Sequence, residues 1–202
     1  MRDVMRLDLK QNGIYVSVVF FIQLFSKLIL SVTADVLKSK KILSHTTSVK
    51  IFQVFSNTLT AIASLILGLY IDCSHEVLII FVLCLYGIGL SAAIPGCFTA
   101  LVSIAPSYAG TLTAFGLVAA TFANILSPWT VAFIVKEGTR DEWAVIFVII
   151  AMINLISSVA FGFFGTADIQ PWAHSVVQTE SGLELTDERQ KCKALIQRVD
   201  EG

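Results

Sequence analysis

The sequence predicts an all-α membrane protein with about five transmembrane helices, and three observations lead to this fold class. Hydrophobic residues make up 55% of the 202 residues and charged residues only 14%, whereas soluble domains carry roughly 25% charged residues. The mean hydropathy is +0.79. The apolar residues also lie in continuous blocks, each long enough to supply the roughly 20 residues that a helix needs to cross a bilayer.

Five such blocks follow one another, separated by short charged or proline-containing breaks. They run over about 13–34, 51–71, 77–105, 108–135 and 143–164. Transmembrane β-strands would alternate apolar and polar residues, and these blocks do not. Five nearly uncharged segments are also too many for one soluble core. We therefore expect a helical bundle over 13–165, with an extracellular or lumenal start at 1–12 and a cytoplasmic tail at 166–202.

The orientation is predicted from the basic residues between the blocks. The segment 35–50, expected to be a polar loop, holds Lys38, Lys40, Lys41 and Lys50. Cytoplasmic loops are enriched in Lys and Arg, so this segment is expected on the cytoplasmic side. Five spans then place the N-terminus outside and the tail in the cytoplasm. Basic residues on the other side reduce the contrast: Arg2, Arg6, Lys10, Lys136 and Arg140.

Several function classes lack any support in the sequence. A net charge of −1 gives no basic field for binding nucleic acid. The four cysteines have no metal-ligand spacing, and no disulfide framework is expected. The three histidines lie far apart, and no nucleophile–base pair or phosphate-binding loop is present. The sequence therefore predicts no catalytic residue, no metal, no cofactor and no enzymatic activity.

Polar residues inside the apolar blocks are the candidates for gating or for a solute pathway, namely Lys27, Asp35, Asn57 and Asn124. Lys27 is the one ionisable residue well inside a block. A charge at the bilayer centre is costly, which favours a pathway role or an ion pair. The alternative is a side chain that extends toward the cytoplasmic interface. The two asparagines, like Gln23, Gln53 and Asn154, suit hydrogen bonds between helices or the lining of a cavity.

The third and fourth blocks are rich in small residues, which let helix backbones approach closely in a membrane. They include Gly87, Gly89, Ser91, Gly96, Gly110, Gly116 and Ala120. Tight packing is the simpler interpretation, and packing between helices that slide during transport is the other. Pro95 and Pro128 each remove one backbone hydrogen bond and are expected to bend their helices.

Several motifs match a known family. The most specific is Thr139-Arg140-Asp141-Glu142-Trp143, followed at a family-typical distance by Gln170-Pro171-Trp172-Ala173. Shorter matches are Thr33-Ala34-Asp35-Val36-Leu37, Tyr86-Gly87-Ile88-Gly89-Leu90-Ser91 and Ile104-Ala105-Pro106-Ser107-Tyr108-Ala109. With these segments the chain resembles the carboxyl half of the major facilitator superfamily. More narrowly, it resembles the anion transporter family that includes sialin, the vesicular glutamate transporters and the sodium–phosphate cotransporters.

The resemblance covers about residues 4–173 and implies the last five helices of a twelve-helix fold. It implies ion-coupled transport of a small anionic solute, either an organic anion or phosphate, with sodium or protons as the coupling ion. Asp35, beside the lysines of 35–50, is the residue carried over to a gating role. The chain departs from the family at Ala100-Leu101-Val102-Ser103-Ile104, where the family has Asn-His-Leu-Asp-Ile, and at Ser107, where it has arginine.

These departures and the absent helices leave two interpretations open. In the first, the chain is a fragment or truncated member of an anion transporter and needs further helices or a partner chain for a full transport path. In the second, it is a non-transporting truncated or accessory membrane protein. A plasma membrane and an intracellular vesicle membrane both fit the sequence.

Overall fold

The computed structural model describes residues 9–70, 76–170 and 173, and all regular structure in those residues is helical. The predictions for residues 1–8 and for the tail at 171–172 and 174–202 lie outside the described residues. Five long helices are present: α2 (Leu9–Ser39), α3 (His45–Tyr70), α4 (Glu76–Ala92), α6 (Ala109–Ile134) and α7 (Arg140–Phe164). Three short helices lie between α4 and α6: η1 (Ile94–Phe98), α5 (Thr99–Ile104) and η2 (Pro106–Tyr108).

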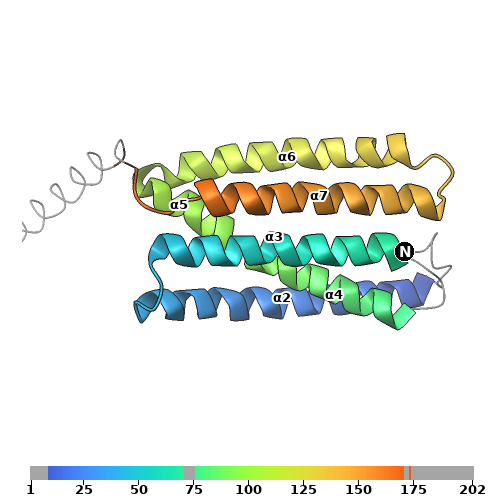
Figure 1. Cartoon of the computed structure of the whole chain (residues 1–202), viewed down its shortest axis with the longest axis horizontal. Coiled ribbons are helices and arrows are strands. Elements are labelled where there is room, and N and C mark those ends of the chain that lie inside the picture. Colours follow the sequence, from blue (N-terminus) through green and yellow to red (C-terminus); the bar gives the residue numbers. More distant parts are fainter. Residues whose placement is uncertain (1–8, 71–75, 171–172, 174–202) are drawn as a thin grey trace, which may run out of the picture.

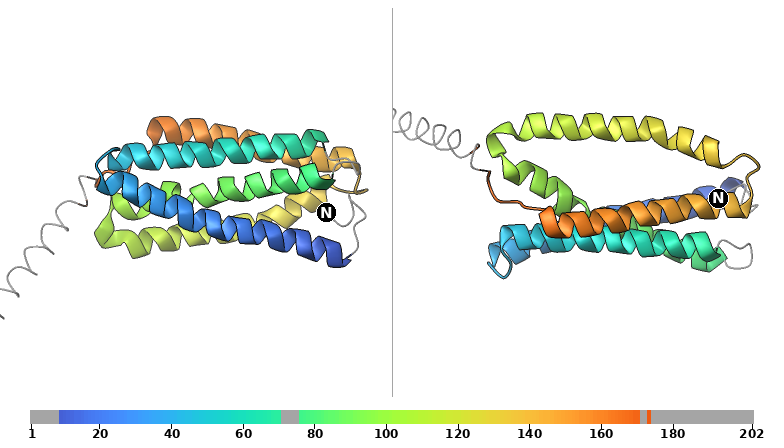
Figure 2. Two further views of the ribbon diagram at one scale, coloured as in Figure 1. Left: turned by 90° about the horizontal axis from the view of Figure 1, so that it is seen from below. Right: turned by 45° about the horizontal axis from the view of Figure 1, so that its top comes forward.

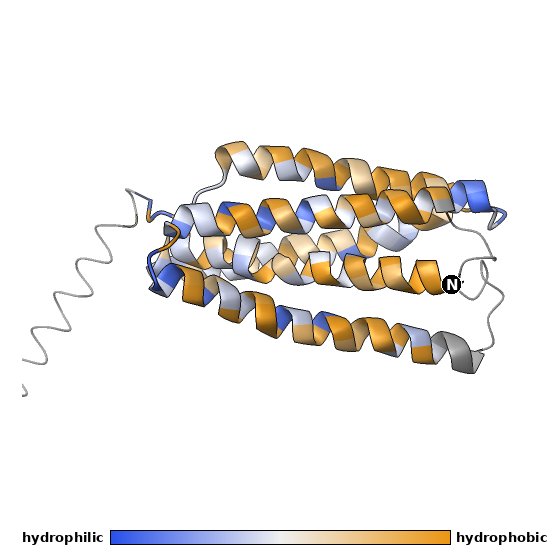
Figure 3. Cartoon of the chain, turned by 60° about the horizontal axis from the view of Figure 1, so that its bottom comes forward, coloured by the Kyte–Doolittle hydropathy of each residue, from blue (hydrophilic) through white to orange (hydrophobic). Residues whose placement is uncertain are grey.

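Five segments are long and apolar enough to cross a membrane: Gly13–Ser39, His45–Leu69, Val77–Ile104, Pro106–Ile134 and Arg140–Phe164. They correspond one to one with the five apolar blocks, so the all-α membrane fold is confirmed. The helices lie side by side, and the chain reverses direction at each end of the bundle (Figure 1). The protein is therefore a multi-pass integral membrane protein, with apolar residues along its helices (orange in Figure 3).

The lysine-rich segment 35–50 differs from the predicted loop, because most of it is helical. Helix α2 continues to Ser39 and α3 begins at His45, so only 40–44 lie between them. The prediction was wrong because it took the first charge as the end of the helix. A lysine in the last turn, here Lys38, is instead favourable beside the free carbonyls of a helix C-terminus. The reversal follows at Lys41, whose φ of 53° is left-handed.

Helix α3 lies at the centre of the bundle, with α7 on one side and α4 on another (Figures 1 and 2). Most buried residues belong to it or pack against it, including the apolar cluster of Ala63, Leu67, Ile79 and Val82. Helix α2 packs mainly against α4. Helix α6 is different, because none of its residues is buried. It stands away from the other long helices and joins the bundle chiefly through α5 and η2 (Figure 2, right).

A basic side chain forms a hydrogen bond between the antiparallel helices α3 and α7 at each end of the pair. Arg140 Nη2, at the start of α7, donates to the carbonyl oxygen of Leu69 near the end of α3 at 3.1 Å. Lys50 Nζ, near the start of α3, donates to the carbonyl oxygen of Phe163 near the end of α7 at 3.5 Å. The last carbonyls of a helix have no partner within the helix and carry partial negative charge, so a basic donor stabilises them.

Candidate functional site

A line of buried polar side chains runs along one face of α3, and we call it the polar seam. It consists of Gln53, Ser56, Asn57, Thr60 and Ser64, all of which are buried. Residues three and four apart share one face of a helix, so this spacing makes one continuous stripe. The stripe faces α4 and η1, since the hydroxyl of Ser56 donates to the carbonyl oxygen of Gly89 at 2.7 Å.

The side chains of the polar seam form hydrogen bonds with one another and with nearby backbone carbonyls. Gln53 Nε2 donates to Asn57 Oδ1 at 3.1 Å. The hydroxyl of Thr60 donates to the carbonyl of Ser56, and that of Ser64 donates to the carbonyl of Thr60, each at 2.8 Å. A buried polar group without a partner costs free energy, and these bonds remove that cost.

Side chains of the polar seam also form hydrogen bonds with backbone groups at a break in the helix of the third span. Pro95 has no N–H and its ring crowds the preceding turn, so the α-helix ends at Ala92 and resumes at Thr99. Between them the chain takes a π-helical turn, in which the N–H of Phe98 donates to the carbonyl of Ala93 at 3.4 Å. The N–H of Cys97 donates instead to Gln53 Oε1 of α3 at 2.9 Å.

Helix α3 also forms a hydrogen bond with a second backbone group that loses its helical partner at this break. The N–H of Ala93 donates to the carbonyl of Leu90 at 3.3 Å, three residues back. The Gly89 carbonyl, which that N–H would meet in a regular α-helix, accepts the hydroxyl of Ser56. Gln53 and Ser56 therefore supply one acceptor and one donor to the two sides of the break.

Helix α2 meets the other side of α4 through small residues. Ser91, which is fully buried, donates its hydroxyl to the carbonyls of Gln23 at 3.0 Å and of Gly87 at 2.8 Å. A Cβ on Gly87 would lie 3.6 Å from the Cβ of Gln23. The small residues of the third span thus bring α2 and α3 close to α4, as expected for tight helix packing.

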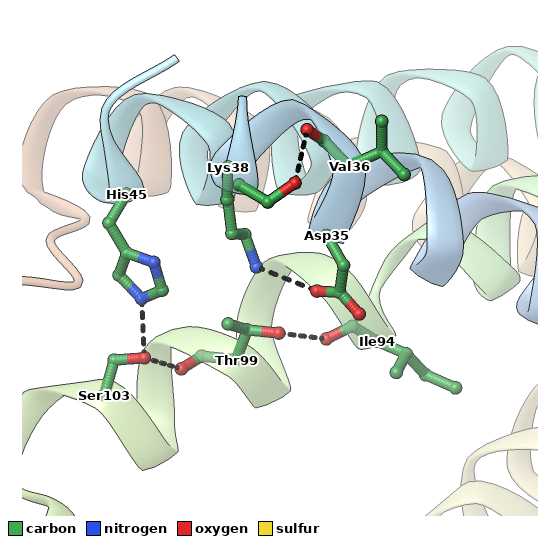
Figure 4. Close-up of polar contacts among 8 residues, drawn as sticks. Asp35, Val36, Lys38, His45, Ile94, Thr99 and Ser103 are labelled. Carbon is green, nitrogen blue, oxygen red and sulfur yellow. Dashed lines mark hydrogen bonds and ion pairs between the residues drawn. The ribbon is translucent and has the colours of Figure 1, made fainter. Parts of the chain in front are cut away.

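The four predicted gating or pathway residues lie in different surroundings. Lys27 is half-buried on α2, one turn beyond Gln23, and forms no ion pair or hydrogen bond with the residues that the structure describes. Asp35 has 79% of its side chain exposed and lies 3.7 Å from Lys38 Nζ (Figure 4). Asn57 is buried in the polar seam. Asn124 is exposed on α6. Their roles in transport stay predictions.

One end of the bundle carries contacts that local sequence patterns do not signal. The ring nitrogen Nε2 of His45 and the hydroxyl of Ser103 are 2.7 Å apart, and that hydroxyl donates to the carbonyl of Thr99 (Figure 4). The N–H of Gln170 donates to the carbonyl of Ile104 at 3.0 Å. We call the His45–Ser103 and Gln170–Ile104 contacts the end clasp. It joins α5 to the start of α3 and to the segment after α7.

The polar seam offers neutral amides and hydroxyls without an ionisable group. Within the described residues no three histidine, cysteine, aspartate or glutamate side chains come together in a way that could hold a metal ion. Cys84 and Cys97 are free thiols.

No protein-family model matches the chain, but individual relatives do. It is 26% identical over 194 residues to an uncharacterized transporter of Caenorhabditis elegans, covering 96% of this chain and 35% of the relative. It is 30% identical over 156 residues to vesicular glutamate transporter 2.1 of Danio rerio, covering 77% and 26%. It is 27% identical over 176 residues to a probable small intestine urate exporter of Homo sapiens, covering 85% and 34%.

The chain spans about a quarter to a third of the length of these curated relatives. All three are named as transporters, two of them for anions, and they match most of the five spans. These matches confirm the family resemblance that the sequence motifs indicated. The chain belongs to the anion transporter family of the major facilitator superfamily, the family of sialin, the vesicular glutamate transporters and the sodium–phosphate cotransporters.

Proposed function

We propose that the chain contributes its five spans to an ion-coupled secondary transporter that moves a small organic anion or phosphate, with sodium or protons as the coupling ion. The observation that carries this proposal is its similarity, over most of its length, to relatives named for glutamate and urate transport. The five membrane-spanning helices agree with such a role.

Lys27 is the side chain that suits an anionic solute best. It is a half-buried cation within the first span, and none of the described residues neutralises it. Intramembrane charges are expensive, and by default they mark a substrate or ion pathway. Asp35, beside Lys38 at the end of the same helix, suits a gate, because its side chain is 79% exposed and can leave the ion pair for water.

Further helices of the same transporter, or a partner chain, would complete the path. Helix α6 supports this part of the proposal, because it holds Asn124 and has no buried residue. An asparagine facing lipid alone would leave its amide without a hydrogen-bond partner. A protein or water-filled surface against α6 would supply one.

The orientation that we propose places the segments 40–44 and 165–170 in the cytoplasm. That end of the bundle holds Lys38, Lys40, Lys41 and Lys50. The opposite end, around 135–142, holds two basic residues, Lys136 and Arg140, together with three acidic ones. The positive-inside tendency favours the first end as the cytoplasmic one.

A chimera tests the transport proposal. The matching carboxyl-terminal region of the zebrafish vesicular glutamate transporter 2.1 is replaced by residues 13–170 of this chain, and glutamate uptake is measured in proteoliposomes. Uptake is expected to persist, to fall in Lys27→Met and to recover in Lys27→Arg. A chimera that inserts and folds but transports nothing would contradict the proposal.

An accessory, non-transporting role is the second candidate. The same assay on the 202-residue chain alone separates the two. Uptake of glutamate, urate or phosphate above empty liposomes, under a sodium or proton gradient, would exclude the accessory role. Its absence, together with an active chimera, would mean that the spans are competent but need the remaining helices.

A further inference from the structure

We propose that the turn between α2 and α3 binds the anionic phospholipids of the cytoplasmic leaflet through Lys40, Lys41 and Ile42. We call these three residues the tip. Such binding goes beyond the solute, the coupling ion and the further helices of the proposed function, and only the choice of leaflet rests on the orientation given there. Three observations support it: the depth of the tip in the membrane, its unpaired charge and the backbone conformation of Lys41.

The tip lies at the depth of the lipid headgroups. It follows the span Gly13–Ser39 and precedes the span His45–Leu69. At about 1.5 Å per residue, the 27 residues of the first of these spans measure roughly 40 Å. A bilayer is about 40–45 Å thick when its headgroup regions are included. The two ammonium groups that directly follow this span are therefore level with the lipid phosphates.

The positive charge of the tip is not neutralised within the part of the chain that the structure describes. Lys38, just before the tip, lies 3.7 Å from Asp35. Lys40 and Lys41 are both exposed, and neither forms an ion pair with a described residue. Asp168, another carboxylate at this end of the bundle, forms no such pair with them. The membrane supplies the missing negative partner, because cytoplasmic leaflets contain anionic lipids that attract lysines close to their surface.

Lys41 has a backbone conformation that favours glycine. Helix α2 ends in a Schellman motif, in which the N–H of Lys41 donates to the carbonyl of Lys38 at 3.0 Å and the N–H of Ile42 donates to that of Leu37 at 3.2 Å. The φ of Lys41 is 53°, which is left-handed, and glycine is the usual residue at this position. A Cβ is unfavourable there. The turn alone therefore does not explain a lysine, whereas contact of its charge with a headgroup does.

Ile42 adds an apolar contact directly beside the two charges. Its side chain is 63% exposed, although it lies between two apolar spans. At a membrane surface an apolar side chain is stabilised by entering the boundary of the acyl chains, while neighbouring lysines keep their ammonium groups in the headgroup region. A phospholipid offers a phosphate and acyl chains together, so it matches both parts of the tip. A soluble anion would use the lysines alone.

Native mass spectrometry of the whole chain in detergent micelles tests the headgroup contact. Phosphatidylserine and phosphatidylcholine are titrated separately, and the lipid retained per chain gives each Kd. Phosphatidylserine is expected to bind more tightly. Lys40→Gln and Lys41→Gln should each weaken its Kd about fivefold, which is the effect of one lysine near anionic lipids. The matched control Lys136→Gln removes an exposed lysine at the opposite end of the bundle and should leave the Kd unchanged.

Two results of this titration would overturn the proposal. One is equal retention of the two lipids by the unmodified chain, and the other is the same Kd in Lys41→Gln as in Lys136→Gln. Glycerophosphoserine, which has the headgroup without the acyl chains, serves as the competitor. We expect it to displace no phosphatidylserine at equal concentration. Displacement there would mean that the tip binds soluble anions, and the lipid assignment would be wrong.

Lys41→Gly separates lipid binding from folding. Glycine suits the left-handed φ of this position, so the variant is expected to unfold at a higher fraction of denaturing detergent in mixed micelles. Its Kd for phosphatidylserine should nevertheless weaken about fivefold. Unchanged phosphatidylserine binding in Lys41→Gly would contradict the role of this lysine. None of these measurements requires transport, so failure of the lipid site and failure of the proposed function give different results.

Discussion

Gly96 of η1 lies so close to Gln53 of α3 that a Cβ on the glycine would stand 2.6 Å from Oε1 and 3.0 Å from the Cα of Gln53. The glycine lets the interrupted third span rest directly on the central helix, and the same approach brings the N–H of Cys97 within 2.9 Å of Oε1. Packing and hydrogen bonding at the break thus depend on the absence of a side chain at Gly96.

Gly96→Ala is therefore expected to destabilise the bundle. The added methyl group must displace backbone atoms of α3, and overpacking of this kind costs about 1–3 kcal/mol. The matched control is Gly110→Ala in α6, where a Cβ would meet nothing within 4 Å and the helix gains roughly 0.5–1 kcal/mol. Reversible unfolding in mixed detergent micelles measures both. Equal stability of the two variants would show that the break does not contact α3.

Two serines on α3 are expected to respond in opposite ways to replacement by alanine. Ser48 Oγ is buried and has no hydrogen-bond partner among the described residues, so Ser48→Ala should stabilise the chain by about 1 kcal/mol. Ser56 donates to the released carbonyl of Gly89, so Ser56→Ala should destabilise it by about 1–3 kcal/mol. The same unfolding assay compares them, and a loss of stability in Ser48→Ala would mean that its hydroxyl has a partner.

Removal of the basic donor that α7 supplies to the end of α3 is expected to have a smaller effect on stability. Arg140→Gln removes the charged donor to the carbonyl of Leu69, and a basic group at a helix C-terminus contributes about 0.3–1 kcal/mol. Lys136→Gln is the control, since Lys136 is exposed and has no side-chain hydrogen bond to the described residues. The loss should shrink in high salt, because the interaction is exposed and screened. A salt-independent loss would point to packing of the arginine stem instead.

Lys27 should show a conflict between stability and function. Lys27→Leu removes a half-buried charge from the first span and is expected to raise the free energy of unfolding. The gain should be at most roughly 2.5–3.5 kcal/mol, which is the cost of a lysine at the centre of a span on insertion scales. Glutamate uptake by the chimera should fall in the same variant. A destabilised Lys27→Leu would indicate that the lysine forms a structural ion pair.

The five spans could be predicted from sequence because the bilayer imposes a length and an apolar composition on every helix that crosses it. The helix ends could not. Asp35 looked like the start of a loop, but α2 continues to Ser39 and has Lys38 in its last turn, where the charge is favourable. Pro95 predicted a bend in the third span, but the π-helical winding depends on contacts with α3.

The candidate site was harder to predict, for a related reason. Polar residues inside apolar blocks stand out one by one, and Asn57 was found in this way. Which of them meet is decided by packing between helices: Gln53 and Cys97 are 44 residues apart, and His45 and Ser103 are 58 apart. No local spacing connects such pairs, so the sequence predicted neither the bond between Cys97 and Gln53 nor the end clasp.

Single-cysteine labelling at the two ends of the bundle tests most directly whether its helices cross the membrane. Lys40→Cys, Lys136→Cys and Asp168→Cys, each at an exposed position, are placed one at a time in a cysteine-free chain in sealed vesicles and treated with a membrane-impermeant maleimide. We expect positions 40 and 168 to be labelled from the cytoplasmic side and position 136 from the opposite side, because the four spans after α2 separate them. Labelling of 136 from the same side as 40 and 168 would contradict it.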